Sequence, residues 1–116
     1  MRIRSASGKT VFEDVELADT PLKRAKGIML KSQIRKPMLF IFRREARFEN
    51  SIHSFFCFVP FDAIFLDEKR KIVDIIPNVK PFSLSVVPKK PSKYLIECKG
   101  GSAKKLKLRE GQALRF

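Results

Sequence analysis

The 116 residues of the chain include 25 Lys and Arg against 12 Asp and Glu, a formal net charge of +13. The length suffices for one domain with its own core, and a hydrophobic content of 44% excludes an intrinsically disordered chain. Residues 1–68 carry 12 basic and 9 acidic side chains, and residues 69–116 carry 13 and 3. This charge attracts nucleic acid, anionic lipid headgroups or acidic proteins. The alternative is a highly charged soluble protein from a hot or salty cell, without a dedicated anionic partner.

The chain has two cysteines, Cys57 and Cys98, and one histidine, His53. This set cannot assemble an ordinary zinc site, so we predict no metal and no cofactor. Both cysteines lie in apolar, strand-like contexts, where we expect buried reduced thiols. No apolar run is long enough to span a bilayer, and the first ten residues lack the apolar segment of a signal peptide. We therefore expect a cytoplasmic protein without a membrane span.

The N-terminal part of the sequence predicts a hairpin followed by a short helix. Residues 2–4 and 10–18 have strand-like patterns and are joined by a turn at residues 7–9. Thr20 can cap a helix, and the proline after it suits the first helical position. Apolar residues at three- and four-residue spacing continue this amphipathic helix towards residue 29.

The middle of the chain predicts the centre of the sheet. Residues 38–42 form a compact apolar strand, and the charged segment 43–49 connects it to residues 50–67. This last stretch has seven apolar residues in a row, which favours a central strand covered on both faces. With residues 71–76 it predicts a β-hairpin whose tip is residues 67–70.

The C-terminal part predicts two more strands and a second short helix. Three prolines between residues 78 and 92 favour an extended connection, and residues 93–99 form a strand. Two glycines and Ser102, a candidate cap, lead into a helix at residues 103–106. The last strand is expected at residues 113–116.

These elements together predict a mainly β fold over residues 1–116, as one compact domain. The architecture expected is a β-sandwich or a barrel-like fold with one or two short helices. Eleven Phe, one Tyr and no Trp predict a core filled largely by Phe. An apolar strand covered on both faces could take its second layer from another copy of the chain, so a homodimer is a candidate assembly.

Five motifs in fixed order over about residues 10–116 resemble a known family. They are Ala18-Asp19-Thr20 with Arg24-Ala25 and Gly27-Ile28-Met29, Met38-Leu39-Phe40-Ile41-Phe42, Pro60-Phe61-Asp62 with Ile64-Phe65-Leu66-Asp67, Tyr94-Leu95-Ile96-Glu97, and a Gly-Gly, helix, Gly111, strand ending. The chain thereby resembles the uncharacterised family called domain of unknown function 192 (DUF192). The resemblance implies a compact, mainly β domain with short helices, and it implies no activity.

One part of the sequence departs from the bacterial pattern of that family. Bacterial members typically carry a Lys-Asn pair before the Pro-Leu-Asp motif, and this chain has Phe55-Phe56 there. A site built on the Lys-Asn pair is therefore not carried over. The Ser-Ile-His sequence at residues 51–53 resembles the archaeal branch.

No residue is assigned a catalytic role, and the candidate ligand-binding residues are Asp19, Thr20, His53 and Asp62. The helix start at Thr20 would expose N–H groups that bind anions. Asp62 follows a proline and a phenylalanine, where a carboxylate commonly accepts hydrogen bonds from backbone amides. We therefore favour a non-catalytic binding or interaction module with a pocket near the hairpin and Thr20 for a small anionic ligand.

Two alternatives stay open. One is binding of nucleic acid or another polyanion through the C-terminal basic residues Lys89, Lys90, Lys104, Lys105, Lys107 and Arg109. Few aromatic residues accompany them, so stacking of bases is weakly indicated. The other is an enzyme in which His53 and Asp62 perform acid–base chemistry. This is the least favoured, because no nucleophile–His–carboxylate pattern or Gly-rich phosphate loop is present in the sequence.

Overall fold

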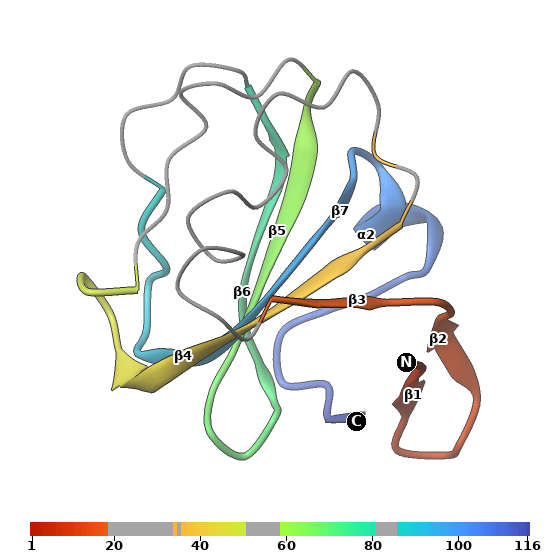
Figure 1. Cartoon of the computed structure of the whole chain (residues 1–116), viewed down its shortest axis with the longest axis horizontal. Coiled ribbons are helices and arrows are strands. Elements are labelled where there is room, and N and C mark those ends of the chain that lie inside the picture. The colour runs from red at the N-terminus through yellow and green to blue at the C-terminus, as the bar shows by residue number, and fades with distance from the viewer. Residues whose placement is uncertain (19–33, 35, 51–58, 81–85) are drawn as a thin grey trace.

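The computed structural model describes residues 1–18, 34, 36–50, 59–80 and 86–116 (Figure 1). This part of the chain is mainly β, as the sequence predicts. Its strands are β1 (Ile3–Ser5), β2 (Thr10–Phe12), β3 (Glu16–Ala18), β4 (Met38–Ala46), β5 (Phe61–Leu66), β6 (Ile72–Val79), β7 (Ser92–Lys99) and β8 (Leu114–Arg115), and its helix is α2 (Ser102–Lys105). None of the helical structure described there is long and apolar enough to cross a membrane.

The strands form two sheets. The smaller has the order β2-β1-β8, and the larger has the order β3-β4-β7-β5-β6. The pair β3–β4 is parallel, and the other pairs are antiparallel. The predicted N-terminal turn is confirmed, since the Ser5 N–H donates to the Lys9 carbonyl at 2.8 Å. The predicted hairpin tip is also confirmed, since the Asp67 N–H donates to the Lys71 carbonyl at 2.9 Å.

Strand β5 is buried at all six positions because both of its faces are covered. Its residues Ile64 and Leu66 belong to a core cluster that includes residues of the small sheet. Phe61 and Phe65 belong to a second cluster on the opposite face. The prediction of a strand covered on both faces is therefore confirmed for residues 61–66, although the middle strand of the sheet is β7.

The prediction of one strand over residues 10–18 is wrong. The segment divides into β2 in the small sheet and β3 in the large sheet. Glu13 and Asp14 are exposed between the buried Phe12 and Val15, and Asp14 has a φ of 52°. The chain bends at these acidic residues because the apolar residues before and after them pack in different sheets.

One further prediction needs a correction, and two others lie outside the described part. The charged segment 43–49 is not all connection, because β4 continues to Ala46, which pairs with Ser92 of β7. The exposed side chains of residues 43–45 do not prevent this pairing, since they remain in water. The predicted helix from Thr20 and the stretch 51–58 lie outside the described residues.

Candidate functional site

Asp62 is the most completely bonded side chain near the predicted site. It lies on β5, is fully buried, and accepts three hydrogen bonds from backbone N–H groups. Oδ1 accepts from Asn78 at 2.9 Å and from Gly101 at 3.1 Å, and Oδ2 accepts from Ala103 at 2.8 Å. The expectation that this carboxylate bonds backbone amides is confirmed. Its effect is to fix the turn that begins α2 to strand β5 of the large sheet.

The prediction that Ser102 caps this helix is wrong. The N-cap residue is Gly101, which has no side chain that could form a capping hydrogen bond. The carboxylate of Asp62 on β5 caps the helix instead, because it accepts a hydrogen bond from the Ala103 N–H. Glycine is required at both positions before the helix, for different reasons. Gly101 has a φ of 92°, and a Cβ at Gly100 would lie 2.6 Å from Oδ1 of Asn78.

The other predicted ligand-binding residues, Asp19, Thr20 and His53, lie outside the described residues. Whether Asp62 contacts a ligand stays a prediction, and its observed partners all belong to the protein's own backbone. These bonds occupy the Gly101 amide just before α2 and the Ala103 amide in its first turn, so neither is available to an external anion.

A cleft of about 290 Å³, named here the α2 cleft, lies between α2, the end of β7, β2 and the segment before β4. Its apolar wall consists of Phe12, Ile34, Pro37 and Leu106, and its polar and charged residues are Glu13, Lys36, Cys98, Lys99, Ser102 and Lys105. A second cleft of about 280 Å³ shares Ile34 and Lys99 with it and continues to Pro60, Asn78 and Gly100. Lys99 therefore lies between the two clefts.

Three lysines give the α2 cleft a positive rim. Lys36 lies 3.3 Å from Asp14, in an exposed pair that water screens. Lys99 and Lys105 are also exposed. The thiol of Cys98 is buried, and burial, followed by the negative charge of Asp62, raises its pKa to about 12. The thiol is therefore neutral near pH 7, as expected for a structural cysteine.

The C-terminal basic residues are mostly at the surface. Lys104, Lys105, Lys107 and Arg109 are exposed on α2 and the turn after it. Lys90 is exposed as well, whereas the ammonium of Lys89 pairs with Glu110 and lies 3.9 Å from Asp74. A role for these six residues in polyanion binding stays a prediction. Within the described ranges, no group of three His, Cys, Asp or Glu side chains could hold a metal ion.

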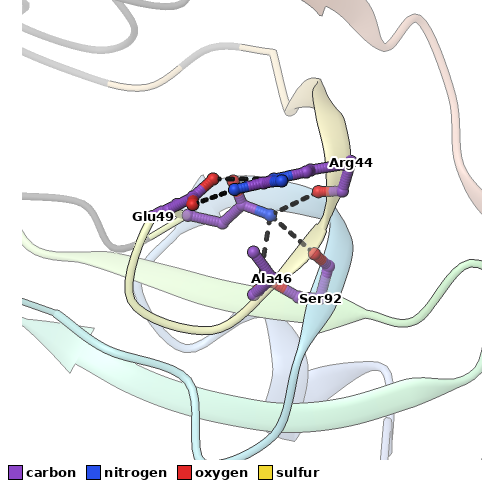
Figure 2. A network of polar contacts seen from close by, with 5 residues as sticks. Arg44, Ala46, Glu49 and Ser92 are labelled. Atoms are coloured by element: carbon purple, nitrogen blue, oxygen red, sulfur yellow. Dashed lines mark hydrogen bonds and ion pairs between the residues drawn. The ribbon is translucent and has the colours of Figure 1, made fainter.

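Sequence reasoning missed a polar network at the far end of β4. The buried side chain of Asn50 donates to the carbonyls of Ser92 at 2.7 Å, Arg44 at 2.8 Å and Ala46 at 3.3 Å (Figure 2). Arg44 also forms a two-bond ion pair with Glu49 across the loop. An asparagine in a charged segment gave no sequence signal for this, because the acceptors are carbonyls whose positions depend on the fold.

Comparison with known proteins gives one family and two similar structures. Residues 2–116 match the family DUF192, described as "Uncharacterized ACR". The UPF0127 protein TK1120 of Thermococcus kodakarensis is 37% identical over 114 residues, 98% of this chain and 71% of that protein. A protein of unknown function from Novosphingobium aromaticivorans has a similar crystal structure, with a TM-score of 0.85, 23% identity, and coverage of 99% of this chain and 82% of that one. The crystal structure of a "putative transcription regulator" from Sinorhizobium meliloti has a TM-score of 0.83 and 29% identity, with 98% and 89% covered.

Proposed function

This chain belongs to the uncharacterised family DUF192, and we propose that it is a non-catalytic binding module whose α2 cleft takes a small amphipathic anion. The observation that supports this is the combination of an apolar wall and a lysine rim in one hollow. Small-molecule sites are concave, mostly apolar, and carry a few polar groups that fix orientation. A volume of about 290 Å³ is at the lower end of their range, so the ligand is small.

The chemistry of the cleft favours a ligand with an apolar body and one anionic head. Phe12 and Leu106 would contact the body, since they contribute apolar surface to the cleft from β2 and from the end of α2. The ammonium groups of Lys99 and Lys105 would attract the head. Two lysines outweigh the single carboxylate of the lining, Glu13, and the long lysine stems also cover apolar surface.

Binding suits the cleft better than catalysis. The thiol in its wall is held neutral, with a pKa of about 12, and so is a poor nucleophile near pH 7. The nearby carboxylate of Asp62 has three backbone donors and no exposed surface. The same carboxylate holds the start of α2 in place, and a rigid wall reduces the ordering cost of binding.

Thermal unfolding with octanoate and the neutral octanamide tests the proposal. Octanoate at ten times its dissociation constant should stabilise the fold by about 1.4 kcal/mol, and octanamide at the same concentration should stabilise it less. The variant Lys105→Ala should weaken the octanoate effect, and Lys104→Ala is the matched control on the same helix, outside the cleft lining. No stabilisation by octanoate, or equal losses in the two variants, would contradict the proposal.

A second candidate function, polyanion binding, is supported by the exposed cations of residues 104–109. Four of these six residues are basic and exposed, and a structural neighbour at 29% identity is described as a "putative transcription regulator". A gel-shift titration over a range of salt concentrations tests it. Neutralising Lys104 and Lys107 together should reduce the salt slope by about 2, since each phosphate contact contributes about 0.9. Absence of binding near physiological salt would exclude this candidate.

A further inference from the structure

Phe48 is exposed to an unusual degree in the loop that follows β4. Its exposed fraction is 68%, the highest among the large apolar side chains of the described residues. A single exposed apolar residue needs no explanation by itself. Phe48 differs because a cationic side chain, that of Arg47, lies over its ring and is itself held in place.

The guanidinium of Arg47 lies over the Phe48 ring, 4.6 Å from its centroid. Arg47 is fixed there because its Nε donates to the carbonyl of Pro88 at 2.8 Å, a contact between segments 41 residues apart. The arginine covers one face of the ring, and the high exposure of Phe48 leaves the other face to solvent. The pair is thus an aromatic platform supported by a cation.

The loop that carries this pair is itself ordered by the network in Figure 2. The amide of Asn50 binds three carbonyls, one of which is on β7, and thereby ties the end of the loop to the large sheet. Glu49, beside Phe48 in sequence, is paired with Arg44. The loop therefore presents Phe48 without having to become ordered on binding.

The charge around Phe48 is positive because basic residues outnumber acidic ones in residues 43–49, three arginines against Glu45 and Glu49. Glu49 pairs with Arg44, and Glu45 accepts a hydrogen bond from the Glu68 N–H at 2.8 Å. The ammonium of Lys93 donates to the Arg43 carbonyl at 2.9 Å, and Arg43 lines a cleft with Glu49 and Asn50, so both residues lie at this end of the sheet. Exposed Lys90 follows two residues after Pro88, the partner of Arg47.

We propose that Phe48 and the cations around it form a binding surface for single-stranded nucleic acid. A base stacks on the open face of Phe48, and the phosphates on either side pair with Arg47, Arg43 and Lys93. Aromatic platforms bordered by basic residues bind single strands in this way, with little sequence preference. A cleft adjoins this surface, but its described lining, Arg43, Arg44, Glu49 and Asn50, includes no apolar side chain to hold a small ligand's body. A duplex would hide its bases from the ring.

This surface is separate from the α2 cleft. The cleft includes Lys36 and Pro37, directly before β4, whereas Phe48 lies after the end of that strand. A nine-residue strand is about 30 Å long, and Figure 1 shows α2 and the end of β4 on opposite sides of the molecule. The Phe48 surface is therefore distinct both from the proposed small-ligand site and from the basic residues of the segment 104–109.

Fluorescence anisotropy with a labelled oligothymidylate of about ten nucleotides tests the inference, since single-strand sites span about 4–16 nucleotides. Phe48→Ala should weaken binding by about 5- to 150-fold, the loss that stacking of one base predicts. Phe48→Trp should retain the affinity, and Lys9→Ala, which removes an exposed cation from the turn between β1 and β2, should leave it unchanged. Arg47→Ala should reduce the salt slope by about 0.7, the contribution of one phosphate contact on a single strand.

Several results would overturn the inference. These are equal affinities of wild type and Phe48→Ala, a loss in Phe48→Trp as large as in Phe48→Ala, or binding to phosphatidylserine vesicles without binding to the oligonucleotide. Loss of binding after neutralisation of residues 104–109 together with full binding by Phe48→Ala would overturn it and leave polyanion binding intact. The octanoate experiment is independent of all these outcomes.

Discussion

Replacing Asp62 with Asn should destabilise the protein strongly although the two side chains have nearly the same shape. The carboxylate uses both oxygens, one for the N–H groups of Asn78 and Gly101 and the other for that of Ala103. An amide offers one oxygen. In either orientation its NH2 group faces at least one backbone N–H, so a buried donor lies opposite a donor.

The cost follows from the bonds that are lost. A hydrogen bond to a charged group contributes about 1.5–3 kcal/mol, and a buried donor without a partner costs about 1–3 kcal/mol. The favourable orientation loses the bond to Ala103 and leaves its N–H unpaired, which gives about 2.5–6 kcal/mol in total. For a chain of this length, this corresponds to a decrease in Tm of about 10–24 °C.

Urea unfolding followed by far-UV circular dichroism measures this change, because the chain has no Trp and one Tyr for fluorescence. Asp67→Asn is the matched control. Oδ1 of Asp67 alone accepts from the N–H groups of Lys69 and Lys71, at 2.9 and 3.0 Å in a partly exposed turn, and an amide oxygen can keep both bonds. If Asp62→Asn were as stable as Asp67→Asn, the carboxylate would not hold the start of α2 as described.

Three other substitutions or reactions test separate parts of the structure. Asn50→Ala should lower the free energy of unfolding in urea by about 2 kcal/mol, because its buried amide binds three carbonyls. Arg44→Ala breaks the exposed Arg44–Glu49 pair and should shift the unfolding midpoint much less. Equal shifts in the two variants would contradict the role of Asn50. Gly101→Ala should lower the free energy of unfolding by about 1–2 kcal/mol because of the φ of 92° alone, since a Cβ there would meet no atom within 4 Å. An unchanged midpoint of urea unfolding would refute this. The thiol of Cys98 should resist iodoacetamide at pH 8 in the folded protein and react after unfolding, as peptide mass spectrometry can show. The pKa of this thiol is about 12 in the folded state and 9.0 ordinarily, so the unfolded state loses the proton first. The free energy of unfolding should therefore fall as the pH rises from 9 towards 12.

The sequence predicted those parts of the fold that depend on local chemistry. Strand β5 lies in the stretch 50–67 that was predicted to be covered on both faces, although the apolar run behind that prediction shares only Phe61 with β5. The turns at Gly8 and after Asp67 carry residues that favour tight turns. The division at Glu13 and Asp14 could not be predicted, because alternation indicates which residues are buried and not which sheet buries them. The same limit applies to β4, whose charged end is a strand because β7 lies beside it.

The candidate site was predicted in part, for a related reason. The position of Asp62 after a proline indicated a carboxylate that bonds amides, but two of its three partners lie about forty residues further along the chain. No local pattern reveals such a contact. Phe48 was missed because an exposed aromatic in a charged segment looks like any other loop residue until Arg47 and Pro88 are seen beside it.

The most direct test of the proposed function is a titration of the ¹⁵N-labelled protein with octanoate, followed by ¹H–¹⁵N correlation spectra. The α2 cleft predicts saturable shifts in the amide signals of Lys99, Ser102 and Lys105, with weaker shifts at Phe12 and none in the loop around Phe48. Octanamide at the same concentrations should cause smaller shifts. Absence of shifts at these amides, or shifts that spread over the basic surface without saturating, would contradict a binding site in the cleft.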